Sequence, residues 1–178
     1  MKVGIYAGSF DPVTNGHVDI VQRGLNIVDK LVIGVLHNKN KSALLSVKER
    51  IDLIKKALEE NEIDISRVEI VESNELLVDF AKENKATINI RGVRTTKDYE
   101  YEKDMALINK KLYGKLETVF LVADSDKSII SSSMVKEIIS FGGDVSEFVP
   151  KCVAHILKNI WKKDRLGEWK WVLVELSK

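Results

Sequence analysis

Short apolar runs alternate with segments of helical periodicity from one end of the chain to the other, and this alternation limits the possible folds most. Five of the runs are short and rich in β-branched residues, as buried strands are. They are Val3–Ala7, Leu31–Leu36, Val68–Val71, Thr87–Ile90 and Thr118–Val122. Strands that alternate with helices pair in parallel, and the helices cover both faces of their sheet. The pattern therefore predicts an α/β protein with a Rossmann-like, doubly wound parallel sheet.

Amphipathic segments fill the intervals between the runs, with apolar residues spaced to lie on one face of a helix. Ser46 and Glu49 stand in the register of a capping box at the start of the second segment. Pro150 is placed to open a C-terminal helix over Val153–Ile160. The apolar stripes of the other segments lie at Val18–Val28, Val47–Leu58, Leu77–Ala81, Met105–Leu112 and Met134–Phe141.

The length of 178 residues is that of a single domain. We expect this domain to span residues 1–163 and to be followed by a tail at residues 164–178, whose role the sequence leaves open. The tail contains Trp169, Trp171, Leu173 and Val174. These residues could form an added strand, an interface element or an ordered tail.

Composition excludes several classes of partner. Lys and Arg number 28 and Asp and Glu 27, so the basic excess of nucleic-acid-binding proteins is missing and we expect no nucleic-acid partner. No run approaches the roughly 18–20 apolar residues of a membrane span, so we expect no membrane partner. The single cysteine, Cys152, cannot form an intramolecular disulfide. That suits a reducing compartment, and we predict a cytoplasmic protein.

Polar segments follow the predicted strands, at the edge where open α/β sheets bind their ligands. The first, Gly8–His17, combines glycines with the start of a helix, an arrangement that binds phosphate through backbone N–H groups. It is neither a P-loop nor the dinucleotide fingerprint, because the residues that those motifs require are missing. His17 falls in the first helical turn and faces the same space; the alternative is a histidine that only caps or packs there.

Three further segments at this edge are basic or rich in hydroxyl groups. His37–Ser42 follows the second strand and carries Lys41, although a solvated loop is the alternative. Arg91–Thr96 follows the fourth strand, and its two arginines flank a glycine as in a phosphate clamp. Ser128–Ser133 precedes a helix and forms either a second anion site or a serine-rich turn. Together the four segments indicate a ligand rich in phosphate.

These segments resemble the motifs of the nucleotidylyltransferase superfamily. The usual signature of that superfamily has two histidines, and Thr14 replaces the first of them in Thr14–His17. With this variant, and with Arg91–Arg94, Tyr99–Glu102 and Ile130–Ser133 following in order, the chain resembles the bacterial phosphopantetheine adenylyltransferases. The resemblance covers roughly residues 2–160, and it implies that residues 1–163 form a nucleotidyltransferase domain.

The reaction implied by the resemblance is adenylyl transfer from ATP to 4′-phosphopantetheine, which gives dephospho-coenzyme A and pyrophosphate in coenzyme A synthesis. Mg²⁺ would be the cofactor, held mainly by the ATP phosphates and not by protein ligands. A homo-oligomer, probably a hexamer in this family, and feedback inhibition by coenzyme A are also implied. Because no nucleophile–base pair stands out in the sequence, we expect direct in-line attack by the acceptor phosphate.

The resemblance also assigns residues by position. His17, Lys41 and Arg91 would be catalytic: His17 would donate to an α-phosphate oxygen, and the two cations would hold the attacking phosphate. The acceptor would be bound by Ser9, Lys41, Leu77 and Arg91. ATP would be bound by Ser9, Phe10, His17, Gly92, Val93, Arg94, Glu102, Lys127, Ser128, Ile129, Ile130, Ser131, Ser132 and Ser133. Lys127 departs from the tryptophan of some relatives, and Ser9 from the threonine of many.

Two alternatives remain open from the sequence. One is a related transferase with another acceptor, such as nicotinamide or nicotinate mononucleotide or glycerol phosphate. Thr14 and the block Tyr99–Glu102 favour the pantetheine enzyme over it. The other is a non-catalytic nucleotide-binding module, against which His17, Lys41 and Arg91 argue.

Overall fold

A five-stranded sheet organises the protein in the computed structural model, which describes residues 1–36, 43–123, 131–163 and 169–171. All neighbouring strands of the sheet are parallel, in the order β3-β2-β1-β4-β5. The strands are β1 (Val3–Gly8), β2 (Lys30–Leu36), β3 (Val68–Ser73), β4 (Ile88–Val93) and β5 (Glu117–Val122). The predicted doubly wound sheet is confirmed.

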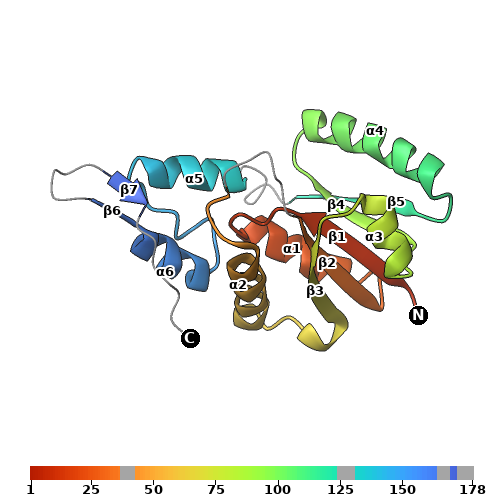
Figure 1. The fold of residues 1–178 in the computed structure, drawn as a ribbon, viewed down its shortest axis with the longest axis horizontal. Coiled ribbons are helices and arrows are strands. Elements are labelled where there is room, and N and C mark those ends of the chain that lie inside the picture. The colour runs from red at the N-terminus through yellow and green to blue at the C-terminus, as the bar shows by residue number, and fades with distance from the viewer. Residues whose placement is uncertain (37–42, 124–130, 164–168, 172–178) are drawn as a thin grey trace.

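Helices connect the strands and continue beyond the last of them (Figure 1). They are α1 (Asn15–Gly24), α2 (Val47–Glu60), α3 (Leu77–Glu83), α4 (Thr96–Leu112), α5 (Ser132–Ser140) and α6 (Lys151–Ile160), with a short 3-10 helix at Ile65–Arg67. Figure 1 shows α5 and α6 at one end of the elongated molecule, beyond α2. The C-terminal helix expected after Pro150 is α6, and β6 (Trp161–Lys163) follows it directly.

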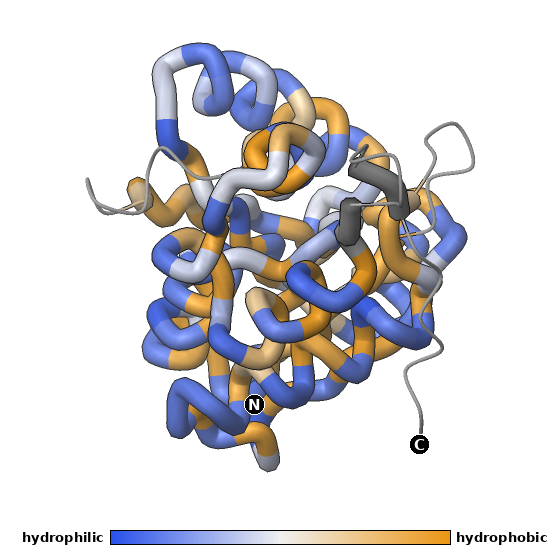
Figure 2. Tube along the Cα trace, turned by 90° about the vertical axis from the view of Figure 1, so that its left-hand side faces the viewer, coloured by the Kyte–Doolittle hydropathy of each residue, from blue (hydrophilic) through white to orange (hydrophobic). Residues whose placement is uncertain are grey.

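Two apolar cores lie on opposite faces of the sheet, because successive residues of a strand point to opposite sides. On β2, Leu31 and Ile33 belong to the core that also holds buried residues of α1, α2, α5 and α6, whereas Val32 belongs to the core beneath α3. Figure 2 shows hydrophobic stretches mostly inside the molecule and hydrophilic stretches on the outer turns of the helices. Residues of both cores are nearly inaccessible to solvent, which makes the sheet a rigid base.

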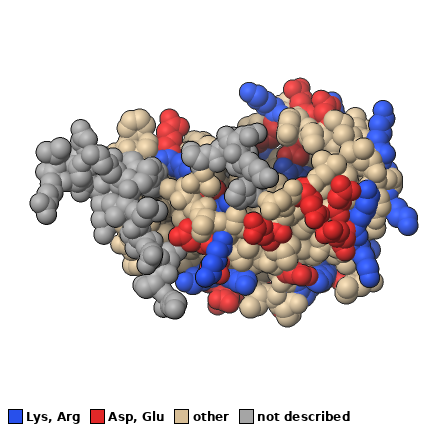
Figure 3. All heavy atoms as spheres, viewed as in Figure 1, with Lys and Arg blue, Asp and Glu red and all other residues tan. Residues whose placement is uncertain are grey.

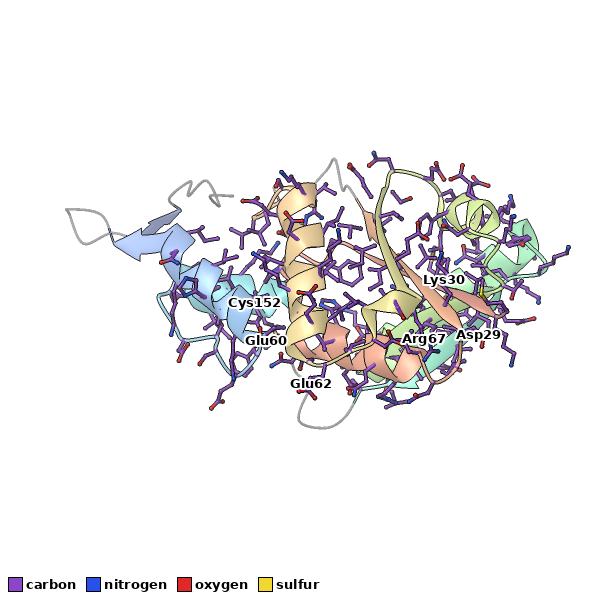
Figure 4. All side chains as sticks on the ribbon, turned by 90° about the horizontal axis from the view of Figure 1, so that it is seen from below. Asp29, Lys30, Glu60, Glu62, Arg67 and Cys152 are labelled. Carbon is purple, nitrogen blue, oxygen red and sulfur yellow. The ribbon has the colours of Figure 1, made fainter. Side chains whose placement is uncertain are left out.

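Local side-chain bonds fix where the elements begin and turn. The predicted capping box of α2 is present: Ser46 accepts from the backbone N–H of Glu49, and Glu49 accepts from that of Ser46. At the opposite edge of the sheet, Arg67 donates to the carbonyl oxygens of Leu25, Val28 and Asp29. Figure 4 shows Arg67 beside Asp29 on this side. Arg67 thus satisfies carbonyls of the turn between α1 and β2.

The structure differs from the sequence prediction most at the end of the fourth strand, and it adds a strand in the tail. The fourth strand runs to Val93, so Arg91 lies within the strand and not in the loop behind it. This extension arises because β5 continues to pair with β4 as far as Val93, opposite Val122. In the tail, β7 (Trp169–Trp171) pairs antiparallel with β6, which is the added strand among the three possibilities left open. Leu173 and Val174 lie outside the described residues.

None of the helices in the described parts of the chain is long and apolar enough to cross a membrane. The division of the chain at residue 163 stays a prediction.

Close packing between β2 and α3 makes Gly34 a test of the fold. A Cβ at Gly34 would lie 2.8 Å from Cε1 of Phe80, a ring that is 3% exposed and has little room to move. Over-packing of this kind typically costs about 1–3 kcal/mol, so Gly34→Ala should lower the free energy of unfolding measured in urea by about that amount. Gly114→Ala is the matched control, since no atom lies within 4 Å of its Cβ position. Equal losses in both variants would contradict the packing described here.

Candidate active site

A large cleft lies at the point where the order of the strands in the sheet reverses. Strand β1 pairs with β2 on one side and β4 on the other, so the connections that leave β1 and β4 separate at their carboxyl ends. Such a switch point is where open α/β sheets bind ligands. Here the cavity measures about 650 Å³ and is lined by residues from the ends of β1 and β4 and from the starts of α1, α4 and α5. Figure 3 shows the surface hollowed on this side, with basic and acidic atoms together in the recess.

The turn after β1 forms one wall of the cavity. Phe10 has a φ of 48°, in the left-handed region that non-glycine residues seldom adopt. Its ring is buried and packs edge-on against the rings of Tyr6, at 5.3 Å, and His17, at 5.0 Å. The strained backbone is compensated by this packing, which holds Ser9 at the cavity and turns the ring of Phe10 against His17.

The first turn of α1 fixes the orientation of His17. Thr14 is the N-cap residue, and its backbone N–H donates to Nδ1 of His17 at 3.0 Å, while its hydroxyl lies 3.1 Å from the same nitrogen. A backbone N–H can only donate, so Nδ1 accepts and the proton of the neutral ring is on Nε2. The capping role considered from the sequence is therefore real. It also fixes the tautomer whose Nε2–H can donate at the cavity that His17 lines.

Burial and nearby cations keep this ring neutral. Desolvation, and then the charges of Arg94 and Arg91, lower the pKa of His17 to about 4. At neutral pH the ring is thus an uncharged hydrogen-bond donor. A donor of this kind can stabilise a developing negative charge without a proton transfer.

Arg91 is held in place before any ligand binds. Its guanidinium forms a two-point ion pair with Glu102, with Nε 2.8 Å from Oε2 and Nη2 bonded to Oε1, and Nη1 donates to the carbonyl of Ala7 at 2.6 Å. Burial alone would lower the pKa of Arg91, but the hydrogen bond and charge of Glu102 raise it above its usual value. Three of its five N–H donors serve these bonds, which leaves two for a phosphate.

A second arginine lies where β4 leads into α4. Nε of Arg94 donates to Oδ2 of Asp98 at 3.0 Å, and both residues line the cavity together with Lys97. Gly92 also lines it, and a Cβ there would meet Ile20 at 3.0 Å, so the backbone passes close to α1. Counting only the side chains that line the cavity, three cations (Arg91, Arg94 and Lys97) face two carboxylates (Asp98 and Glu102). The balance favours an anionic ligand.

The start of α5 forms the far side of the cavity. Ser131 is the N-cap residue and accepts from the backbone N–H of Met134 at 3.1 Å, while the hydroxyl of Ser132 donates to the carbonyl of Pro12 at 2.8 Å. Both serines line the cavity. Of the three hydroxyls of Ser131–Ser133, those of Ser131 and Ser132 thus have structural partners. The first backbone N–H groups of the helix are therefore the stronger candidates for binding an anion.

The sequence-predicted residues do not all meet at this cavity. Val93 is buried, with its carbonyl accepting from the N–H of Ala123, and Leu77 packs against the core under α3. Ser133 is exposed and is not part of the cavity lining. Glu102 reaches the cavity, but its carboxylate binds Arg91. Five further residues lie outside the described residues: Lys41, Lys127, Ser128, Ile129 and Ile130.

Other residues at or behind the cavity were not singled out from the sequence. Tyr6 and Tyr101 line it, and burial raises the pKa of Tyr6 above its usual value. Behind the wall, the side chains of Asp11 and Arg50 are buried and bond to neighbouring loops. A charged residue beside Pro12, or in the apolar stripe of α2, is a weak signal of such a role, because solvated charges are far more common.

Within the described parts of the chain, no group of three or more His, Cys, Asp or Glu side chains could hold a metal ion. The two carboxylates at the cavity are paired with Arg94 and Arg91. The fold and the cavity together are those of a nucleotidyltransferase.

Comparison with known proteins identifies the family. The cytidylyltransferase-like family model matches residues 5–138. A phosphopantetheine adenylyltransferase from Caldanaerobacter subterraneus subsp. tengcongensis is 49% identical over 163 residues, which are 92% of this chain and 99% of that protein. One from Thermotoga neapolitana is 49% identical over 155 residues, 87% of this chain and 94% of that protein. The chain belongs to the cytidylyltransferase-like family and, within it, to the phosphopantetheine adenylyltransferases.

Solved structures of more distant proteins share the fold. A bifunctional NMN adenylyltransferase/ADP ribose pyrophosphatase from Francisella tularensis superposes with a TM-score of 0.71 at 13% identity over 89% of this chain. The match spans about half the length of that protein, 49%. Plasmodium falciparum nicotinic acid mononucleotide adenylyltransferase, complexed with NaAD, gives a TM-score of 0.68 at 16% identity, over 89% of this chain and 95% of that one. At these identities the likeness concerns the fold alone.

The surroundings of His17 predict how it titrates. In a nuclear magnetic resonance titration its ring should protonate with a midpoint near pH 4, because burial, Arg94 and Arg91 disfavour the charged form. The unfolded chain then binds more protons than the folded chain between about pH 4 and 6.5, so stability falls as the pH drops through that window.

His17→Asn serves as the reference variant, because its side-chain oxygen can still accept from the N–H of Thr14 while the ring is lost. It should remove the assigned resonance and flatten the dependence of stability on pH between about pH 4 and 6.5. A His17 midpoint above pH 6 would contradict the neutral ring.

Proposed function

We propose that the protein transfers the adenylyl group of ATP to 4′-phosphopantetheine, giving dephospho-coenzyme A and pyrophosphate in coenzyme A synthesis. The observation that carries the proposal is the cavity at the switch point, where neutral His17, Arg91 and the start of α5 meet. Membership of the phosphopantetheine adenylyltransferases supports this acceptor over the others considered from the sequence.

The proposed chemistry is a direct in-line displacement. An oxygen of the acceptor phosphate forms the new bond to the α-phosphorus as the bond from that phosphorus to the pyrophosphate oxygen breaks. The attacking phosphate is already an anion, so no base is needed to activate it. Catalysis then consists of alignment and stabilisation of charge.

His17 would stabilise the negative charge on the α-phosphate of the transferred adenylyl group. Its Nε2–H would donate to a non-bridging oxygen of the α-phosphate, where negative charge increases as the new bond forms. Thr14 holds the ring at its other nitrogen, because the backbone N–H of Thr14 donates to Nδ1. This orientation precedes ligand binding, so little reorganisation opposes the reaction.

The cations divide between the two substrates. Arg91, oriented by Glu102, would hold the acceptor phosphate with its remaining donors, together with Lys41 from the segment after β2. Arg94 and the backbone at Gly92 would serve the nucleotide, along with Ser9 and Phe10. The start of α5 at Ser131–Ser133 would hold the leaving pyrophosphate. Residues 127–130 would bind ATP, and Leu77 would bind the acceptor.

A divalent cation enters this reaction as part of the nucleotide substrate. Nucleotidyltransferases generally use one, and we propose Mg²⁺, which keeps most of its ligands as water and phosphate oxygens. The paired state of Asp98 and Glu102 supports a metal bound mainly by ATP.

Four further proposals complete the assignment, and those on assembly and on inhibition rest on the family resemblance. The protein would act in the cytoplasm as a homo-oligomer, a hexamer, with residues 1–163 as its nucleotidyltransferase domain, and coenzyme A would inhibit it. Support for self-association comes from α4, where Tyr101, Leu107, Ile108 and Leu112 are exposed apolar side chains. Exposed apolar patches of this kind mark interaction surfaces.

A pyrophosphate-release assay tests the assignment. With ATP and Mg²⁺ the protein should turn over 4′-phosphopantetheine, while nicotinamide mononucleotide, nicotinate mononucleotide and glycerol phosphate should give at most background rates. CTP should replace ATP poorly. Comparable turnover with a mononucleotide acceptor or with CTP would move the protein elsewhere in the superfamily, and nucleotide binding without any turnover would favour a binding module.

Replacement of His17 tests the mechanism. If the ring acts mainly in the transition state, His17→Ala should lower kcat by roughly 10²–10³-fold while ATP affinity changes little. The variant also loses one bond of the α1 capping box, so its control is Glu49→Ala, which loses the equivalent bond in α2 away from the cavity. That control should lower the melting temperature alone. Equal loss of ATP affinity and kcat in His17→Ala would make the contact a ground-state one.

A further inference from the structure

Asp11 is a buried carboxylate that accepts three hydrogen bonds from two separate parts of the protein. It is 4% exposed and lies in the turn between β1 and α1, behind the cavity, whose lining does not include it. Its Oδ2 accepts from the N–H of Leu44 at 2.9 Å and from Nζ of Lys136 at 3.0 Å, and its Oδ1 accepts from the N–H of Leu45 at 3.0 Å. Burying a carboxylate is costly unless such partners compensate it.

Two of these bonds hold the segment that leads from β2 into α2. Leu44 and Leu45 stand directly before the N-cap residue of α2. The other end of this connection is held as well: Nη1 of Arg50, a side chain that is itself buried, donates to the carbonyl of Leu36 at 3.0 Å and to that of Ser9 at 2.7 Å. The connection is therefore attached at both ends to the turn after β1. Lys41 lies between the two attachment points in the sequence.

The third bond reaches the opposite side of the cavity. Lys136 lies in α5, one turn after the serines that line the cavity, and its ammonium group forms an ion pair with Asp11. The hydroxyl of Ser132 donates to the carbonyl of Pro12, so the turn after β1 holds α5 at two neighbouring points. The carboxylate of Asp11 thus connects the segment before α2, proposed to serve the acceptor, with α5, whose start is proposed to hold the pyrophosphate.

We propose that Asp11 is a positioning residue that holds Leu44 and Leu45, directly before α2, and the start of α5 at a fixed distance from each other, and so aligns the two substrates. The inference rests on the proposed function, because it assigns the acceptor to one side and the leaving pyrophosphate to the other. In-line transfer is sensitive to such alignment, and a displacement of about 1 Å can cost about 10²-fold in rate.

Asp11→Asn tests this role with the smallest change in shape. The amide keeps one acceptor oxygen but presents an N–H₂ group in place of the other, so the bonds at Oδ1 and at Oδ2 cannot both persist. Either the bond from Leu45 is lost, or those from Leu44 and Lys136 are lost together. We expect kcat/KM for 4′-phosphopantetheine to fall by about 10–100-fold while the Kd of ATP alone changes less than about threefold. Exchange of the Leu44 or the Leu45 amide proton, whichever loses its acceptor, should accelerate by about tenfold or more, which can be measured without any acceptor substrate.

Lys136→Met distinguishes the bond to α5 from the bonds to Leu44 and Leu45, because it removes only the bond to α5. Its kcat/KM should fall by a smaller factor than that of Asp11→Asn, with the exchange of Leu44 and Leu45 unchanged. The double variant should be no worse than Asp11→Asn, since both substitutions break the same ion pair. Lys136→Met retains all bonds between Asp11 and the backbone, so it keeps the proposal testable if Asp11→Asn fails to fold.

Glu60→Gln is the matched control. Glu60 also accepts from two consecutive backbone N–H groups, those of Lys151 at 2.9 Å and Cys152 at 3.0 Å, but it joins α2 to α6 outside the cavity lining. Figure 4 shows Glu60 beside Cys152 at this junction. Its replacement should lower the melting temperature without changing kcat/KM for the acceptor.

The outcomes separate the positioning role from a structural one. The proposal is overturned if Asp11→Asn keeps kcat/KM within about threefold of the wild type, or if Glu60→Gln loses as much at an equal drop in melting temperature. Loss of ATP affinity in step with kcat/KM would also overturn it. If the wild-type protein releases no pyrophosphate with 4′-phosphopantetheine, the proposed function fails, and unchanged amide exchange in Asp11→Asn would then independently refute the anchoring by Asp11.

Discussion

The position of β1 between β2 and β4 is the constraint on which the rest of the structure depends. Parallel pairing on both sides brings the carboxyl ends of β1 and β4 to one edge, and the chain then leaves the sheet toward opposite faces. The crevice between these exits cannot be filled by either connection. It therefore becomes a cavity whose walls are the turn after β1, the end of β4 and the starts of three helices.

Within this cavity, each functional side chain is oriented by a bond to its own backbone surroundings. Nδ1 of His17 accepts from the N–H of Thr14, and the guanidinium of Arg91 is held by Glu102 and the carbonyl of Ala7. Both arrangements are made by the protein's own groups, so the donors that face a phosphate are preorganised. The same cations that attract phosphate also keep His17 neutral, which makes the ring a donor and not a competing charge.

The turn after β1 connects the parts of the site as well as lining it. Its residues bond to α2 through Arg50, to α5 through Lys136 and Ser132, and to the loop before α6, where Asn15 donates to the carbonyls of Glu147 and Phe148. One turn thus sets the distances between elements that are more than 100 residues apart in sequence. This arrangement explains how a site assembled from several loops stays rigid on a sheet that contributes few side chains to it.

The sequence by itself determined the sheet class, the order of helices and strands, and the segments that carry the site. Those features depend on apolar periodicity, glycines and capping residues, which are local in the chain. Only the tertiary structure decided that Arg91 lies within β4 and is paired with Glu102, that Val93 is buried, that Leu77 packs against the core beneath α3, and that Asp11 is buried. These outcomes depend on contacts between residues distant in sequence, and whether a charged side chain is solvated or paired is set by such contacts, not by its neighbours in the chain.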